Sequence, residues 1–124
     1  MQILLSIIVS LEIPVVIEGQ YCYENAIMVN NIKDFGNVSG AAVLKHTYTL
    51  VNITDEDIHL RIVRPSCSCT KVSCGAMSIP RHGSLDIVVE YDVDLHKGYF
   101  DKSIMILVVG RKKPLILKIR GYVL

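Results

Sequence analysis

The chain contains no tryptophan and only two phenylalanines among its 124 residues. Surfaces that stack nucleic-acid bases are built mainly from aromatic side chains, so we expect no such surface here. An excess of one charge is also missing, because 13 Lys and Arg face 12 Asp and Glu and leave a net charge of +1. Without a positive field to attract phosphates, we expect no nucleic-acid partner.

Helical periodicity is absent as well. From residue 27 onward, apolar residues recur at every second position in short runs that turn residues separate. Residues 44–50 and 85–91 show this alternation most clearly. About seven such runs predict an all-β fold, an antiparallel β-sandwich of about seven strands, with a small barrel as the alternative. The length fits one domain, which we place at residues 23–124.

The same alternation predicts which side chains face the interior. Eight residues share the inward phase of five strands and are expected to form the core between the sheets: Leu50, Leu60, Ile62, Ile87, Val89, Ile106, Leu117 and Ile119. Pro65 should end a strand, because it lacks the N–H that a strand ladder requires. Residues 34–37 (DFGN) predict a turn, and residues 77–79 predict a short edge strand.

The first 19 residues differ from the rest. Residues 3–17 are nearly all apolar, yet they are fewer than the roughly 20 that a membrane-spanning helix needs. That length suits the hydrophobic part of a signal peptide, although no Lys or Arg precedes it and Glu12 interrupts it. We therefore predict that residues 1–19 are a signal peptide or hydrophobic anchor, with N-terminal membrane anchoring as one outcome. An extra strand over residues 13–17 is the alternative.

Cys67 and Cys69 are the sharpest chemical feature, and Cys74 follows closely. In an extended strand, residues two apart have Cα atoms about 6.6 Å apart, so a Cys67–Cys69 disulfide needs a local kink. A Cys69–Cys74 bridge is easier to close, and the pairing of all four cysteines, Cys22 included, stays open. We favour a structural thiol or disulfide cluster. The alternatives are a thiol redox pair or a Cu or Zn site formed by Cys67, Cys69 and Cys74, with His82 as a further ligand.

The other polar residues predict no catalytic site. His46 falls in the inward phase of its strand, and the remaining histidines are scattered without a nucleophile or carboxylate at a motif spacing. Asp92 and Asp94 fit a solvated strand end, and residues 111–113 (RKK) fit a charged hairpin turn. Asn37 and Asn52 match glycosylation sequons but are expected to be turn residues. We therefore predict no catalytic residue, no resident cofactor and no enzyme activity.

An ordered set of short motifs carries a family resemblance. They are Asp34-Phe35-Gly36-Asn37-Val38, Tyr48-Thr49-Leu50-Val51-Asn52, Arg64-Pro65-Ser66-Cys67-Ser68-Cys69-Thr70, Ile79-Pro80-Arg81-His82-Gly83, Gly98-Tyr99-Phe100-Asp101-Lys102-Ser103-Ile104 and Ile119-Arg120-Gly121-Tyr122-Val123. Together they resemble a bacterial Ig-like family of unknown function with an S-C-G-C-T signature, related to Hydin-like and major-sperm-protein-like domains. Ser68 stands where that family usually has glycine, and Cys74 has no counterpart in its pattern.

The resemblance implies an Ig-like sandwich in an exported protein, in the periplasm or at the cell surface. It implies no reaction. We therefore expect a non-catalytic structural or interaction module whose partner is a protein or a cell-envelope component. The alternative is a thiol redox or soft-metal-handling domain centred on Cys67 and Cys69.

Overall fold

The computed structural model describes residues 20–40, 42–93 and 97–124. The predicted signal peptide or anchor, residues 1–19, lies outside these residues. The described segments form ten strands, more than the seven or so that the sequence predicts. Among these residues, none forms a helix with the length and apolarity that crossing a bilayer requires.

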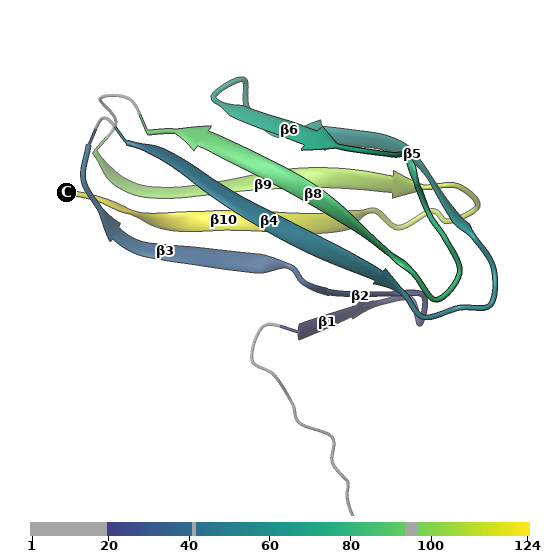
Figure 1. The fold of residues 1–124 in the computed structure, drawn as a ribbon. Coiled ribbons are helices and arrows are strands. Elements are labelled where there is room, and N and C mark those ends of the chain that lie inside the picture. Colours follow the sequence, from purple (N-terminus) through teal and green to yellow (C-terminus); the bar gives the residue numbers. More distant parts are fainter. Residues whose placement is uncertain (1–19, 41, 94–96) are drawn as a thin grey trace, which may run out of the picture.

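The strands form two packed sheets (Figure 1). The first sheet has the order β1 (Gln20–Tyr23), β2 (Ile27–Asn30), β4 (Val43–Asn52), β8 (Ser84–Asp92) and β6 (Thr70–Cys74). The second has the order β3 (Ile32–Val38), β10 (Leu115–Val123), β9 (Gly98–Val108), β5 (Ile58–Pro65) and β7 (Ser78–Ile79). All neighbours are antiparallel except β3 and β10, which run parallel. The chain thus moves from one sheet to the other between β2 and β3.

The core lies between the sheets, as the alternation predicts. Seven of the eight predicted core residues are buried, each no more than 5% exposed: Leu50, Leu60, Ile87, Val89, Ile106, Leu117 and Ile119. The eighth assignment, Ile62, is wrong because Ile62 is only half-buried. A β-bulge between Leu60 and Ile62 inserts an extra residue opposite β9, so the inward phase passes to Val63, which packs against the core.

The predicted turn at residues 34–37 is also wrong, because these residues belong to β3. The turn-forming residues instead produce a bulge within the strand, where β3 has one residue more than β10. Gly36 has a φ of +68°, and its N–H donates to the Asp34 carboxylate at 2.8 Å. Glycine adopts this left-handed conformation without the steric cost that other residues incur, so local turn chemistry is retained inside a strand.

Two further predictions are confirmed, the end of a strand at Pro65 and a short edge strand near residues 77–79. Pro65 is the last residue of β5, and the predicted edge strand appears as β7, paired only with β5. The segment after Pro65 makes a turn and then forms β6 on the edge of the other sheet. The two cysteines of the C-x-C motif therefore lie where the chain changes sheets.

Candidate functional site

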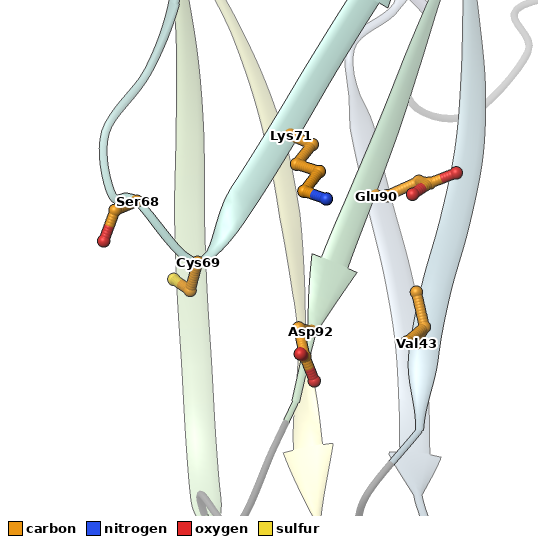
Figure 2. Close-up of a pocket in the computed structure, with 6 residues that line it drawn as sticks. All are labelled: Val43, Ser68, Cys69, Lys71, Glu90 and Asp92. Carbon is orange, nitrogen blue, oxygen red and sulfur yellow. The ribbon is translucent and has the colours of Figure 1, made fainter.

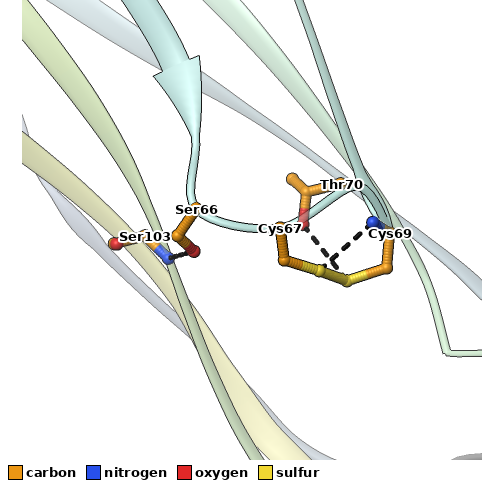
Figure 3. Close-up of a disulfide and its surroundings, with 5 residues drawn as sticks. All are labelled: Ser66, Cys67, Cys69, Thr70 and Ser103. Atoms are coloured by element: carbon orange, nitrogen blue, oxygen red, sulfur yellow. Dashed lines mark hydrogen bonds between the residues drawn. A yellow bond between two sulfur atoms is a disulfide. The ribbon is translucent and has the colours of Figure 1, made fainter.

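Residues 66–69 form the connection from β5 to β6. Ser66 fixes its start to β9, because the Ser66 N–H donates to the Ser103 carbonyl at 2.8 Å and the Ser103 N–H donates to Ser66 Oγ at 3.1 Å (Figure 3). The Thr70 N–H donates to the Cys67 carbonyl at 3.2 Å and closes the turn. Hydrogen bonds at both ends thus position the cysteines just beyond Pro65, at the end of the strand that the sequence predicts to stop there.

Cys67 and Cys69 are joined by a disulfide (Figure 3). Their Cα atoms are 5.4 Å apart, closer than the spacing of about 6.6 Å in an extended strand, because both residues lie in a turn. The expectation that Cys69 pairs more easily with Cys74 is wrong for this reason. The Cys69 N–H also donates to Cys67 Sγ at 3.1 Å. Ser68 does not have a positive φ, so replacing the family's glycine costs no left-handed strain here.

A shallow polar groove of about 220 Å³ borders the disulfide on the outer face of the first sheet. Figure 2 shows its lining, which comes from β4, β8, β6 and the turn: Val43, Ser68, Cys69, Lys71, Glu90 and Asp92. Glu90 lies directly opposite Lys45 on one side and Lys71 on the other. The Lys45 Nζ–Glu90 Oε2 distance is 4.0 Å, and both side chains are well exposed. The ion pair between them therefore adds little to the stability of the fold.

The structure does not bring the proposed thiol or metal cluster together. Cys74 is at the far end of β6, roughly 13 Å from Thr70 at about 3.3 Å per residue. It is free, and its Sγ lies 3.9 Å from Met77 Sδ. His82 precedes β8, whereas Cys69 contacts the residue that ends β8, so roughly 26 Å of strand separates the two. In the described part of the chain, no three His, Cys, Asp or Glu side chains are grouped so that they could hold a metal ion.

A disulfide-bonded sulfur is neither a nucleophile nor a metal ligand. The chemistry open to this pair is therefore reduction or thiol–disulfide exchange, which begins when an external thiolate attacks one sulfur. Both cysteines are half-buried, so one side of the bridge faces solvent beside the groove.

The other polar candidates take structural positions. His46 is half-buried as predicted, with its ring edge-on to Tyr48 at a centroid distance of 4.6 Å. Burial lowers the His46 pKa, and the nearby charge of Lys33 lowers it further, so the neutral ring is favoured. His82 Nε2 lies 2.8 Å from Asp55 at the surface, and His59 is exposed. His96 and Asp94 lie outside the described residues.

The basic hairpin tip is partly engaged within the chain. Arg111 Nη1 donates to the Glu24 carbonyl at 2.9 Å and lies 3.2 Å from Glu24 Oε1, so this arginine ties the β9–β10 turn to the turn after β1. Lys112 and Lys113 are exposed. This arrangement fits the predicted charged turn.

Asn52 is a key residue whose role the sequence analysis understated. Its side chain is 1% exposed at the end of β4, and its Nδ2 donates to the carbonyls of Glu56 at 2.8 Å and Ile79 at 2.9 Å. Its Oδ1 accepts from the N–H and the hydroxyl of Thr54. The prediction that Asn52 is a turn residue is therefore wrong, because Asn52 ends β4; its side chain holds the turn that follows and anchors β7 to the first sheet. The sequence signal for this anchoring role was the position of Asn52 at the start of an NITD segment, directly after an alternating run.

Solved structures of low sequence identity share this sandwich. A protein of unknown function from Porphyromonas gingivalis W83 matches with a TM-score of 0.69 and 14% identity, over 78% of this chain and 46% of that chain. The secreted serine protease VesC from Vibrio cholerae matches with a TM-score of 0.65 and 15% identity, over 81% of this chain and 23% of that chain. The chain therefore spans less than half the length of these two structures.

A single domain matches over nearly its full length. The PapD-like domain 7 of human CEP192 has a TM-score of 0.56 and 13% identity, over 92% of this chain and 93% of that domain's chain. At such identities the likeness shows the fold alone, an all-β Ig-like sandwich of the PapD and major-sperm-protein type, and the predicted fold class is confirmed.

A search of curated proteins finds no match. One family model, described as "Protein of unknown function (DUF1573)", matches residues 27–123, which run from the first residue of β2 to the last residue of β10.

Proposed function

The chain belongs to the DUF1573 family of proteins of unknown function, and on that premise we propose that it is a non-catalytic, exported Ig-like domain that acts as a structural or protein-interaction module of the cell envelope. Its partner is a protein or an envelope component. One observation carries the proposal: most of this chain corresponds to only a part of several longer chains with different activities.

Those longer chains supply the argument for a module. VesC is titled a secreted serine protease, and this chain corresponds to 23% of it. A family 123 glycoside hydrolase from Clostridium perfringens and the SrpA adhesin from Streptococcus sanguinis contain the same kind of sandwich, over 23% and 61% of their chains. A fold that accompanies proteolysis, glycan hydrolysis and adhesion supports none of these activities by itself. It is better explained as a part that positions or binds other parts.

Two further features support an exported location. The Cys67–Cys69 disulfide is expected to persist only in an oxidising compartment. The apolar segment at residues 3–17 suits a signal peptide or anchor. Both features concern the compartment and not the partner.

Cell fractionation tests the proposal. The full chain, tagged at its C-terminus, is produced in a bacterial host, and the cytosolic, periplasmic and membrane fractions are probed. We expect the chain in the periplasmic or membrane fraction, accessible to protease once the outer layer is permeabilised. A protease-protected chain in the cytosolic fraction would contradict the proposal. A cytosolic protein of the same host, probed in parallel, controls for leakage.

The half-buried disulfide beside a groove favours a second candidate, thiol exchange centred on Cys67 and Cys69. The double variant Cys67→Ser/Cys69→Ser separates the two functions. A structural bridge predicts a loss of about 2 kcal/mol or less in the free energy of unfolding, because the closed loop is very short. An exchange function predicts in addition that the wild-type protein oxidises a reduced dithiol peptide stoichiometrically, which the double variant does not.

A further inference from the structure

One edge of β4 is open along most of its length, because among the described residues only β2 pairs with it, and only at its C-terminal end. Along its other edge, β4 pairs with β8 from Val43 to Val51. On the open side it pairs with β2 at Val51 and Asn52 alone, after which the chain leaves for the second sheet. Figure 1 shows β2 beside β4 only near the arrowhead of β4. Among the described residues, no strand is hydrogen-bonded to this side of residues 43–50.

The backbone groups that face the open side can be identified from the alternation of an antiparallel ladder. The Ala42 carbonyl accepts from the Val93 N–H, and the Asn52 N–H donates to the Gly83 carbonyl, so even-numbered residues of β4 point toward β8. The Ile53 N–H donates to the Ala26 carbonyl, so odd-numbered residues point toward β2. The N–H and C=O groups of Val43, Lys45, Thr47 and Thr49 therefore point out of the open edge.

The surroundings of this edge leave room for another strand. A groove of about 340 Å³ runs beside it, lined by residues of β1, β2 and β4 that include Met28, Asn30 and Thr47. The outer face carries two exposed valines near the ends of the edge, Val43 at 63% and Val51 at 38%. A row of unpaired backbone groups flanked by exposed apolar side chains is a template for strand addition.

We propose that the open edge of β4 pairs with the same edge of a second copy of this chain, antiparallel and centred on His46. This interface rests on the proposed function and assigns the chain itself as one partner of the module. In this register Lys45 lies opposite the partner's Thr47, and Val43 lies opposite the partner's Thr49. Each opposed pair of odd-numbered residues exchanges two backbone hydrogen bonds.

The edge is self-complementary only in this register. Moving the centre one position along the chain, from His46 to Thr47, places Val43 opposite the partner's Val51, which β2 already pairs. A shift in the other sense places Lys45 opposite the partner's Lys45, and like charges in that position are destabilising. The proposed register uses the whole open segment, begins where β4 begins and stops before β2. It also brings Val43 diagonally next to the partner's Val51, which shields both exposed side chains.

Charge at position 47 tests the register directly. Thr47→Glu places a carboxylate opposite the partner's Lys45 and should tighten the dimer, whereas Thr47→Lys should weaken it. By symmetry each change occurs twice per dimer, so we expect the dissociation constant to change about two- to thirty-fold in each direction. Sedimentation velocity of the full chain over a concentration series at low salt measures this constant, and circular dichroism checks that each variant is folded.

Ser73 supplies the matched control. Ser73 and Thr47 are exposed and lie on opposite sides of the same residue, Val88, and each has a lysine two positions before it. Ser73→Glu and Ser73→Lys thus reproduce the change in net charge and the local lysine contact on the other edge of the sheet, and they should leave the dissociation constant unchanged.

Three results would overturn the proposal. In the first, the chain stays monomeric at every concentration. In the second, the variants at positions 47 and 73 shift the dissociation constant by the same amount, and in the third neither set of variants changes it. The last of these would indicate contact through another segment. None of them bears on the fractionation experiment, so this interface can fail while the proposed envelope function stands.

Discussion

At the scale of single residues, position in the strand ladder decides burial more than hydrophobicity does. Ile62 and Ile87 are the same residue type, and both fall in an alternating run. Ile87 is fully buried, whereas the bulge in β5 leaves Ile62 half-buried beside Leu107. The contribution of each isoleucine to stability should follow this difference.

Ile87→Ala is expected to lower the free energy of unfolding by about 2–5 kcal/mol, because it removes buried methyl groups and leaves a cavity. Ile62→Ala serves as the matched control and should cost about 1 kcal/mol, since its site is open to solvent on one side. Urea unfolding measures both values. Equal losses, or a larger loss at Ile62, would show that the bulge is misplaced.

Asn52 and Asn37 provide a second pair of identical residues in different settings. Asn52 is buried and satisfies two carbonyls, whereas Asn37 is exposed in β3. Asn52→Ala leaves the Ile79 carbonyl buried without its donor, so we expect a loss of about 1–3 kcal/mol in the free energy of unfolding. Asn37→Ala should change it by less than about 0.5 kcal/mol. Similar losses for the two variants in urea unfolding would refute the anchoring role.

At the scale of elements, the contact between β3 and β10 depends on a glycine, Gly121, which has no side chain to keep the neighbouring groups apart. A Cβ on Gly121 would lie 2.9 Å from the Gly36 carbonyl oxygen and 2.9 Å from Phe100 Cζ. Gly121 therefore lets the β3 bulge and the Phe100 ring approach the β10 backbone closely. The two motifs that contain Gly36 and Gly121 are far apart in the sequence but meet at this point.

Gly121→Ala should cost about 1–3 kcal/mol of the free energy of unfolding, because the added methyl group meets backbone and a packed ring. Gly75→Ala is the control, since nothing lies within 4 Å of its added Cβ and its φ is not positive. That control should change stability by less than about 1 kcal/mol. Thermal unfolding followed by circular dichroism gives both shifts. A neutral Gly121→Ala would mean that β3 and β10 are further apart than described.

The alternation in the sequence predicted elements well where a strand pairs with at least one neighbour over a long, regular ladder. It gave the inward phase of β4, β8, β9 and β10 because each pairs over a long, unbroken ladder or ends at a clear turn. It failed at residues 34–37, where Asp34 and Gly36 have turn chemistry but β10 holds them in a sheet. A pattern within one segment carries no information about which strand will lie beside it.

The candidate site shows the same limit. Pro65 correctly predicted the strand end just before Cys67 and Cys69, because the effect of a proline on its own strand is local. The pairing did not follow, because strand spacing was applied to residues that lie in a turn with Cα atoms 5.4 Å apart. The separation of Cys74 and His82 from this pair depends on the strand β6 and on the length of β8, which are properties of the assembled sheet.

At the scale of the whole molecule, the predicted family resemblance and the all-β sandwich are both confirmed. The motifs named in the sequence occupy the β3 bulge, the end of β4, the β5–β6 turn, the turn before β8, the start of β9 and the end of β10. They thus mark the irregular points of the sandwich, where particular residues are required, while the regular strands tolerate many apolar residues.

The central claim is that this is an exported domain whose Cys67–Cys69 pair is an intact structural disulfide. The most direct test is the intact mass of the full chain from the envelope fraction of a bacterial host, alkylated under denaturing conditions with and without reductant. We predict two alkylated cysteines without reductant, Cys22 and Cys74, and four with reductant. The Cys67→Ser/Cys69→Ser variant should show two in both cases. Four alkylated cysteines without reductant, or a chain found only in the cytosol, would contradict the claim.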